Sequence, residues 1–241
     1  MELLDHTRSR CSTDAARLLE KFGLRACAET GATALYRSRE LSQATNEDVD
    51  SLANLGIQTI YDLRKPAERE RLPEPPLICN AFEVRTCPID LQSDEKRTHS
   101  TMATDVVAAY GQPGERMNHL YSIMAAHADA ILPIVLDIIA ADAPVLVHCA
   151  NGKDRAGIVC ASVQRMLGVH DQTVVDDYLI TNICNAEMNR RDLARYAGFM
   201  QTDEVDVLAA MFEARESYLS TFFACIDAQY GSFEQWIAAG A

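Results

Sequence analysis

The sequence has no C-x-x-C pair and no compact cysteine framework. Its eight cysteines are scattered along 241 residues, at Cys11, Cys27, Cys79, Cys87, Cys149, Cys160, Cys184 and Cys225. Disulfide-stapled domains and structural zinc sites both need clustered cysteines. The spacing therefore favours reduced thiols and predicts neither a disulfide scaffold nor a metal site.

Long apolar runs are also missing. The N-terminal residues MELLDHTRSR contain no apolar segment of the kind found in a cleaved signal peptide. The most apolar stretch, residues 128–141, carries Asp129, Pro133 and Asp137, and a bilayer span needs about 20 apolar residues. We therefore expect a cytoplasmic protein with no stable membrane insertion.

Basic residues are outnumbered, with 22 Lys and Arg against 35 Asp and Glu, which gives a formal net charge of -13. This excess of negative charge opposes long-range attraction to nucleic acids, so no nucleic-acid partner is expected. Any site for an anionic ligand must be built locally. The composition leaves the oligomeric state open.

The length of 241 residues fits one domain, residues 1–241, because chains divide into several domains only beyond roughly 250 residues. Strand-like and helix-like segments alternate in the middle of the chain, and helical patterns dominate its end. This alternation predicts an α/β fold with a mostly parallel central sheet flanked by helices. Residues from about 91 to 130 are predicted to form a helical lid or insertion.

The expected elements follow from periodicity and capping signals. Strands are expected at residues 57–61, near 78–84 and at 144–147, and helices after the Thr45/Asp48 capping pair, at 115–140 with a division near Pro133, and at 156–167. Further helices up to residue 241 are expected to break near Gly198 and Gly231. Polar clusters follow three strand-like segments, at residues 37–39, 62–64 and 148–149. Ligands of parallel sheets bind at the carboxyl ends of the strands.

The third cluster opens the segment VLVHCANGKDRAGIVC, residues 145–160, in which a buried strand passes through a tight turn into a helix. Backbone N–H groups of residues 150–155 can converge in this turn, and the helix adds its positive dipole end. The turn is therefore predicted to bind an anion and to favour Cys149 as a thiolate, the nucleophilic form of cysteine.

The charged side chains of the turn suit phosphate. Arg155, six residues after Cys149, can present a planar fork to phosphate oxygens. Gly152 allows the backbone to turn tightly, and Lys153 adds a second positive charge. Asp154 is repelled by a bound anion unless it is protonated, ion-paired or turned away, and a general acid for the leaving oxygen is one role that suits it.

The pattern HCxxGKDRxG resembles the signature of the bacterial and fungal protein tyrosine/serine phosphatase family, whose members include broad-specificity and phosphoinositide-hydrolysing enzymes. Further segments extend the resemblance over about residues 33 to 240: LYRSREL at 35–41, LGIQTIYDLRKPAE at 55–68, DDYLITN at 176–182 and YGSFEQWI at 230–237. The signature loop is highly specific, whereas each of the other segments is weak alone.

The resemblance implies a role for each residue of the loop. Cys149 is similar to the nucleophile, Asp154 to the general acid and Arg155 to the residue that binds phosphate. The resemblance implies phosphate binding by Ala150, Asn151, Gly152, Lys153 and Arg155, and support of the loop by His148 and Asp62. It implies no cofactor and no metal.

Some residues keep two interpretations. Asp62 can support the loop or simply cap the next helix. Arg37 and Arg64 can bind substrate phosphate or pair with Glu40 and Glu68, and we expect at least one of the two arginines to be functional. Cys160, Cys184 and Cys225 lie at apolar helical positions and are expected in the core.

The sequence thus predicts a phosphomonoester hydrolase that works through a phosphocysteine. Protein phosphotyrosine is the first expected substrate, with phosphoserine, phosphothreonine or phosphoinositides beside it. The alternative is a catalytically weakened phosphate-binding module that regulates by occupancy. A rhodanese-type sulfur-transfer domain ranks lower, because its loop does not require Arg155 at this spacing.

Ala156 departs from the family, which usually has Thr or Ser after the arginine to hydrogen-bond the departing thiolate. A hydrogen bond to a charged group is worth about 1.5–3 kcal/mol. Breakdown of the phosphoenzyme is therefore expected to be slower by roughly ten- to a hundredfold. Quenched-flow kinetics should show a burst of product before slow turnover, and the absence of a burst would contradict this expectation.

Overall fold

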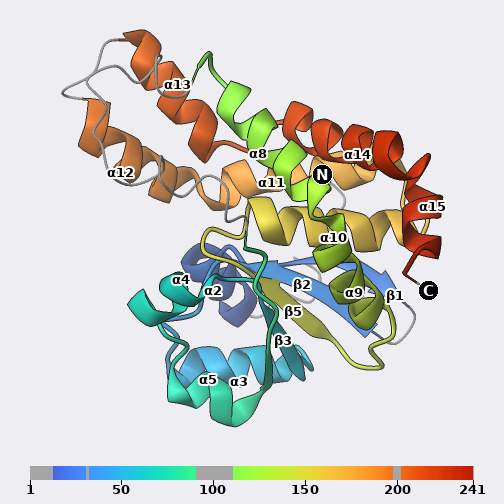
Figure 1. Cartoon of the computed structure of the whole chain (residues 1–241). Coiled ribbons are helices and arrows are strands. Elements are labelled where there is room, and N and C mark those ends of the chain that lie inside the picture. Colours follow the sequence, from blue (N-terminus) through green and yellow to red (C-terminus); the bar gives the residue numbers. More distant parts are fainter. Residues whose placement is uncertain (1–12, 31–32, 91–110, 198–201, 241) are drawn as a thin grey trace. The chain divides into compact units, whose positions relative to one another are not determined.

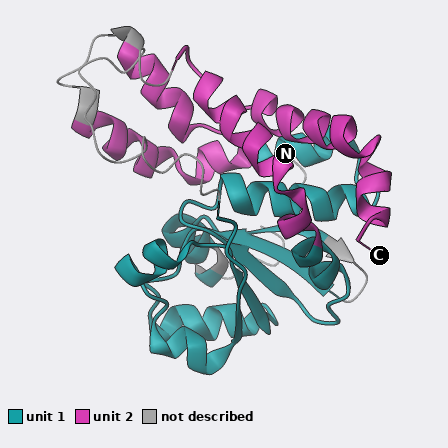
Figure 2. Cartoon of the chain, viewed as in Figure 1, with its two compact units in different colours: residues 1–90, 133–178 teal, residues 91–132, 179–241 magenta. Residues whose placement is uncertain are grey.

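The structure is a computed structural model that describes residues 13–30, 33–90, 111–197 and 202–240 (Figure 1). The chain groups into two compact units, coloured separately in Figure 2. Unit 1 comprises Met1–Asp90 and Pro133–Tyr178, and unit 2 comprises Leu91–Leu132 and Leu179–Ala241. Unit 1 contains the sheet, and the described part of unit 2 is helical.

A five-stranded sheet with the order β1-β2-β5-β3-β4 forms the centre of unit 1. The strands are β1 (Arg25–Thr30), β2 (Thr33–Ser38), β3 (Thr59–Asp62), β4 (Glu83–Thr86) and β5 (Val145–His148). Only β1 is antiparallel to its neighbour; β2, β5, β3 and β4 are paired in parallel. The predicted α/β fold with a mostly parallel central sheet is confirmed.

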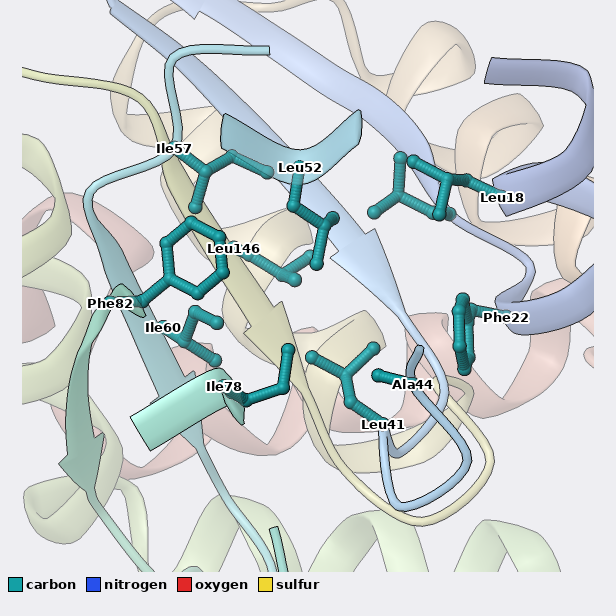
Figure 3. Packing of buried hydrophobic residues seen from close by; sticks show 11 residues of the cluster. Leu18, Phe22, Leu41, Ala44, Leu52, Ile57, Ile60, Ile78, Phe82 and Leu146 are labelled. Atoms are coloured by element: carbon teal, nitrogen blue, oxygen red, sulfur yellow. The ribbon is translucent and has the colours of Figure 1, made fainter. Parts of the chain in front are cut away.

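Helices cover both faces of this sheet. On one face lie α2 (Thr13–Phe22), α3 (Asn46–Asn54) and α5 (Pro76–Ala81), and on the other lies α10 (Asp154–Met166) (Figure 1). The first face carries the cluster of Figure 3, in which Leu52 of α3 and Ile78 of α5 pack with Ile60 and Leu146 of the sheet. A central strand covered on both faces must be apolar throughout, which explains the uninterrupted Val-Leu-Val of β5.

The Thr45/Asp48 pair caps α3 as predicted. The Thr45 side chain accepts a hydrogen bond from the Asp48 N–H, and the Asp48 side chain accepts one from the Thr45 N–H, so the two residues form a capping box. Asp48 is fully buried and also forms ion pairs with Arg17 and Lys21 of α2. This helix start therefore also joins α2 to α3.

Two predicted elements are corrected. The strand expected near 78–84 is helix α5 followed by the short strand β4, because the two prolines at 75 and 76 start a helix. Ile78 inside this helix and Phe82 directly after it are both buried. The 115–140 helix divides at His127 and not at Pro133: α8 is Glu115–Ala126 and α9 is Ala128–Ile139. Pro133 stands inside α9, where it removes one backbone donor without ending the helix.

Unit 2 contains α8, α12 (Ala186–Ala197), α13 (Thr202–Phe212), α14 (Glu216–Tyr230) and α15 (Phe233–Ala238), while α9 and α11 (Asp171–Cys184) belong partly to each unit. Phe222 of α14 and Phe233 of α15 each meet the buried Trp236 edge to face. The predicted break at Gly231 is confirmed, since this glycine has φ of 92° at the end of α14. The predicted break at Gly198 lies outside the described residues.

The predicted lid at about 91–130 falls partly on residues 91–110, which lie outside the described residues. Its described part consists of the turn at 111–114, of α8, of His127 and of the first three residues of α9. Among the described helices, none is by itself long and apolar enough to cross a membrane. The pair α8 and α9, bent by 74°, passes such a test by combined length and composition alone.

Candidate active site

Three parallel strands end side by side at the candidate site. In the register of the sheet, His148 at the end of β5 lies opposite Ser38 of β2 and opposite Asp62 of β3. The backbone continues these pairings beyond the strands, because the Leu63 N–H donates to the His148 carbonyl at 3.0 Å and the Glu40 N–H to the Ala150 carbonyl at 3.2 Å. The three polar clusters predicted at strand ends are thus brought to one edge of the sheet.

The segment 149–153 forms the turn between β5 and α10, as predicted. Cys149, Gly152 and Lys153 are buried, Ala150 is half-buried and Asn151 is exposed. Asp154 and Arg155 are the first two residues of α10, so the positive end of this helix dipole faces the turn. All the residues predicted to bind phosphate therefore belong to one strand-turn-helix connection.

Gly152 is required by the shape of the turn. Its φ of +62° lies in the left-handed region, and a Cβ at this position would lie 2.5 Å from the Ser38 carbonyl oxygen. No side chain fits at that distance, so the turn can approach the end of β2 only with glycine here.

Asp154 is ion-paired, which is one of the three states that the sequence allows for it. Its Oδ1 lies 3.4 Å from the Lys153 Nζ, and its side chain is 24% exposed while that of Lys153 is 3% exposed. Lys153 therefore balances the carboxylate from the buried side. Asp154 keeps enough exposure for a proton to pass between it and a bound molecule.

Arg155 forms a bidentate ion pair with Glu68 of α4 (Pro66–Arg71). Nη1 lies 2.5 Å from Oε2 and Nη2 lies 2.7 Å from Oε1, and Nη1 also donates to the Leu63 carbonyl at 3.2 Å. These contacts use three of the five N–H groups of the guanidinium. The Nε–H and the second Nη2–H lie on one edge outside these contacts, and such a pair has the geometry of a fork for phosphate oxygens.

Electrostatics reinforce the Glu68–Arg155 pair. Burial alone raises the pKa of Glu68, but the bonds from Arg155 outweigh burial and bring this pKa below its usual range. Burial lowers the pKa of Arg155, but Glu68 and the charges of Cys149 and Asp154 outweigh it and raise this pKa. Both partners are therefore ionised at neutral pH, and Arg155 lies within electrostatic reach of Cys149.

The sequence interpretation missed the role of Glu68. It considered Glu68 only as a partner for Arg64, whereas Glu68 holds Arg155, 87 positions further along the chain. One local signal was available, since Glu68 follows Pro66 in the first turn of α4 and its side chain accepts the Lys65 N–H at 2.8 Å. That cap fixes where the carboxylate lies.

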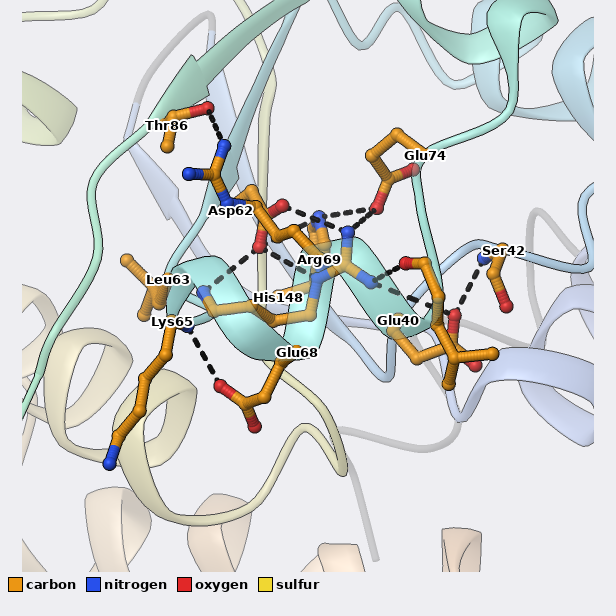
Figure 4. A network of polar contacts seen from close by, with 12 residues as sticks. Glu40, Ser42, Asp62, Leu63, Lys65, Glu68, Arg69, Glu74, Thr86 and His148 are labelled. Carbon is orange, nitrogen blue, oxygen red and sulfur yellow. Dashed lines mark hydrogen bonds and ion pairs between the residues drawn. The ribbon is translucent and has the colours of Figure 1, made fainter. Parts of the chain in front are cut away.

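Asp62 and His148 belong to a buried network behind the turn (Figure 4). Arg64 donates from Nε and Nη2 to the two oxygens of Asp62, both at 2.9 Å, and from Nη2 to Glu74 Oε1 at 2.6 Å. The His148 Nε2 lies 3.3 Å from the same Glu74 oxygen. Burial raises the pKa of Asp62, but the bonds from Arg64 outweigh it and the pKa is lowered. Asp62 is thus an ionised partner of Arg64.

The expectation that Arg37 or Arg64 binds substrate is not supported by their positions. Arg64 is 1% exposed and is engaged by Asp62 and Glu74. Arg37 is fully buried, lies 3.7 Å from Asp177 Oδ2 and donates to the Asp177 carbonyl at 3.3 Å. Both arginines are internal. Arg64 also lies 4.0 Å from Glu40, one of the two partners considered, whereas the partner of Arg37, Asp177, is distant in the sequence.

Asp62, Glu74 and His148 are the one set of metal-ligand side chains that the described residues bring together. Their donor atoms lie within 4.8 Å of one another. The guanidinium of Arg64, however, already bonds both carboxylates at 2.9 and 2.6 Å and brings a positive charge there. A metal cation would be repelled by this charge, so the donor set fits the guanidinium and not a metal.

The fold and the turn together define an α/β protein with a cysteine-containing anion loop at the end of its central strand. A model of the tyrosine phosphatase family matches residues 22–241, and the chain belongs to this family. The family resemblance predicted from HCxxGKDRxG is confirmed.

The chain is also similar to individual proteins. The chain is 28% identical over 227 residues to the triple specificity protein phosphatase PtpB of Mycobacterium tuberculosis, covering 82% of each protein. It is 27% identical over 209 residues to a Cupriavidus necator protein whose name marks it provisionally as a tyrosine-protein phosphatase, covering 84% of this chain and 72% of that one. Among solved structures it is similar to TpbA of P. aeruginosa, with a TM-score of 0.39 and 19% identity over 79% of this chain and 91% of that one.

The Gly152→Ala variant tests whether activity depends on the close approach of the turn to β2 or only on the backbone strain of a positive φ. Its Cβ would meet the Ser38 carbonyl, so the turn must move away from β2, and kcat/KM for a phosphate ester should fall by at least roughly tenfold. Gly168→Ala is the matched control, because Gly168 has φ of +76° but no atom within 4 Å of the added Cβ.

We expect Gly168→Ala to lose about 1–2 kcal/mol of stability from the positive φ and to keep its kcat/KM. Urea unfolding of both variants gives the loss of stability alongside kcat/KM. If kcat/KM falls equally in the two variants, the contact with Ser38 is unimportant.

Proposed function

We propose that this protein is a cysteine-dependent phosphatase that hydrolyses phosphate monoesters through a phosphocysteine intermediate. Membership of the tyrosine phosphatase family supports phosphatase activity. The observation that carries the mechanism is the bidentate Glu68–Arg155 pair, which holds one edge of the guanidinium ready for phosphate beside the cysteine loop.

In the first step the Cys149 thiolate attacks phosphorus and forms an S–P bond. The bond from phosphorus to the ester oxygen breaks, and this oxygen leaves with a proton from Asp154. Arg155 and the backbone N–H groups of the turn bind the phosphoryl oxygens and stabilise their charge in the transition state. The positive end of α10 acts on the same oxygens.

In the second step a water molecule attacks phosphorus and gives its proton to Asp154. The S–P bond breaks, Cys149 leaves as a thiolate, and phosphate is released. Asp154 thus returns to its protonated state for the next cycle. Ala156 is fully buried and has no hydroxyl, so it offers no hydrogen bond to the departing thiolate.

Phosphotyrosine in proteins is the proposed first substrate, because the family is defined by tyrosine phosphatases. Phosphoserine, phosphothreonine and phosphoinositides are proposed as further substrates. The Lys153–Asp154 form of the loop supports this wider range, and so does the similarity to a relative described as a triple specificity phosphatase.

A second candidate function is a phosphate-binding module without turnover, and the alanine at position 156 favours it. Such a module would keep Arg155 and the anion loop but would stop after binding or after the first step. The two functions differ in multiple-turnover phosphate release.

Phosphate release should therefore be measured with phosphotyrosine peptides, phosphoserine peptides and phosphoinositides, with a metal chelator in every reaction and Cys149→Ser as the control. We expect release that exceeds that of Cys149→Ser, fastest with phosphotyrosine. No release above the control, together with retained binding of phosphopeptides, would contradict the enzyme proposal and favour the binding module.

Glu68→Gln tests the positioning of Arg155. Loss of the ion pair removes charge-assisted bonds worth about 1.5–3 kcal/mol, so kcat/KM should fall by roughly 10- to 150-fold. The matched control is Glu70→Gln on the same helix, where the side chain is exposed and the expected change is less than twofold. Unchanged kcat/KM in Glu68→Gln would show that Arg155 is held by other contacts.

A further inference from the structure

Glu74 and His148 form a close pair behind the cysteine loop. The His148 Nε2 lies 3.3 Å from Glu74 Oε1, and the two side chains are 0% and 8% exposed. By hydrogen-bond geometry, neither ring nitrogen of His148 and not the Oε2 of Glu74 has a partner among the described residues. The backbone N–H groups of Cys149 and Leu41 nevertheless lie close enough to affect the pKa values of His148 and Glu74. A buried polar atom in this condition is costly, and a proton between the Nε2 of His148 and the Oε1 of Glu74 would give Nε2 a hydrogen bond.

The charges around the pair also favour the binding of one proton. Two buried carboxylates, Asp62 and Glu74, share one guanidinium, that of Arg64, and Glu40 lies 4.0 Å from the same guanidinium. With both buried acids ionised and His148 neutral, the network carries excess negative charge in a region without solvent. Burial disfavours such a charge, and one bound proton removes it.

We propose that Glu74 and His148 hold one proton between them and that Glu74 is thereby a positioning residue for the phosphate loop. The link to the loop is covalent, since His148 immediately precedes Cys149 and ends β5. The part of the proposal that concerns phosphate binding rests on the proposed function, whereas the shared proton does not.

The expected pKa values agree with this arrangement. Burial raises the pKa of Glu74 to about 7, with Asp62 and Glu40 acting in the same direction and Arg64 opposing them. Burial lowers the pKa of His148 to about 4, against the attraction of Asp62 and Glu40. Cys79 of α5 is a further titratable neighbour, a thiol whose pKa is raised by burial and by Glu74, so it stays neutral.

A consequence for ligand binding follows from the position of the pair. Below pH 7 Glu74 holds the proton and the network is close to neutral. Above pH 7 the proton is lost, and an uncompensated negative charge arises behind the loop that binds a phosphate dianion. Because like charges repel over short, poorly solvated distances, anion binding should weaken as the pH rises through 7.

Folding stability gives a test that is independent of catalysis. Glu74 has a folded-state pKa above its ordinary 4.5, so its contribution to stability is lost as the pH rises to about 7. His148 has a folded-state pKa below its ordinary 6.5, so its contribution is lost as the pH falls toward 4. The two effects oppose each other and nearly cancel in the wild type.

The Glu74→Gln variant should remove this cancellation. Only the His148 effect then remains, so the variant should lose stability as the pH falls from 6.5 to 5 more steeply than the wild type. The unfolding constant of the variant relative to the wild type should rise by up to about tenfold per pH unit over this range. Asp50→Asn, at an exposed carboxylate of α3, is the control and should follow the wild type.

Two results would overturn the shared proton. One is an identical pH dependence of urea unfolding in the wild type and Glu74→Gln. The other is a His148 ring that titrates near pH 6.5 in ¹⁵N NMR spectra of the folded wild type, which remains informative if Glu74→Gln does not fold.

The link to the loop is tested with sulfate, whose charge is constant between pH 6 and 8. Calorimetry in a Cys149→Ser background excludes the titration of the thiol. The sulfate Kd should rise several-fold from pH 6 to pH 8 with Glu74 present and less with Glu74→Gln. Equal pH dependence of the Kd in both proteins would overturn the positioning role of Glu74. Failure of phosphate release alone would instead overturn the proposed function.

Discussion

The parallel pairing of β5 with β2 on one side and β3 on the other is the constraint on which the site depends. It brings Ser38, Asp62 and His148 to one level of the sheet. The cysteine loop then lies between the ends of β2 and β3. The Leu63 N–H donates to the carbonyl of His148 on one side, and the Glu40 N–H donates to the carbonyl of Ala150 on the other. Gly152 lies so close to the end of β2 that any side chain would collide with Ser38. The shape of the loop is therefore set by the sheet as much as by its own residues.

Charged side chains surround the cysteine loop in two places, next to it and behind it. The protein has a net charge of -13, so the attraction for a phosphate dianion has to come from the loop itself. Next to the loop, Glu68 holds Arg155 by one edge and leaves the other edge for the ligand. Behind the loop, Arg64 neutralises Asp62 and part of Glu74. Acidic side chains thus fix the positions of the basic side chains. A protein with a net negative charge can therefore still contain a site for an anion.

Sequence alone was sufficient for what is local or periodic. The strand-turn-helix around Cys149 is contiguous, and the apolar run of β5 together with the strand-end polar clusters predicted that Asp62 and His148 would meet at one edge. Partners distant in the sequence were not predictable in the same way. Glu68 and Arg155 are 87 positions apart, and the burial of Arg37 depends on Asp177, 140 positions away. The helix α5 was mistaken for a strand because Ile78 and Phe82 lie in a short apolar run that both structures can produce.

The position of Asp154 unites these features. In the described structure the Oδ1 of Asp154 lies 3.4 Å from the Nζ of Lys153. A dianion entering the loop adds negative charge beside Asp154 and competes with it for Lys153. In the proposed mechanism Asp154 gives a proton to the leaving oxygen in the first step and takes a proton from water in the second. One carboxyl group can serve both proposed steps because the proton that it gives to the leaving oxygen in the first step is replaced by a proton from water in the second.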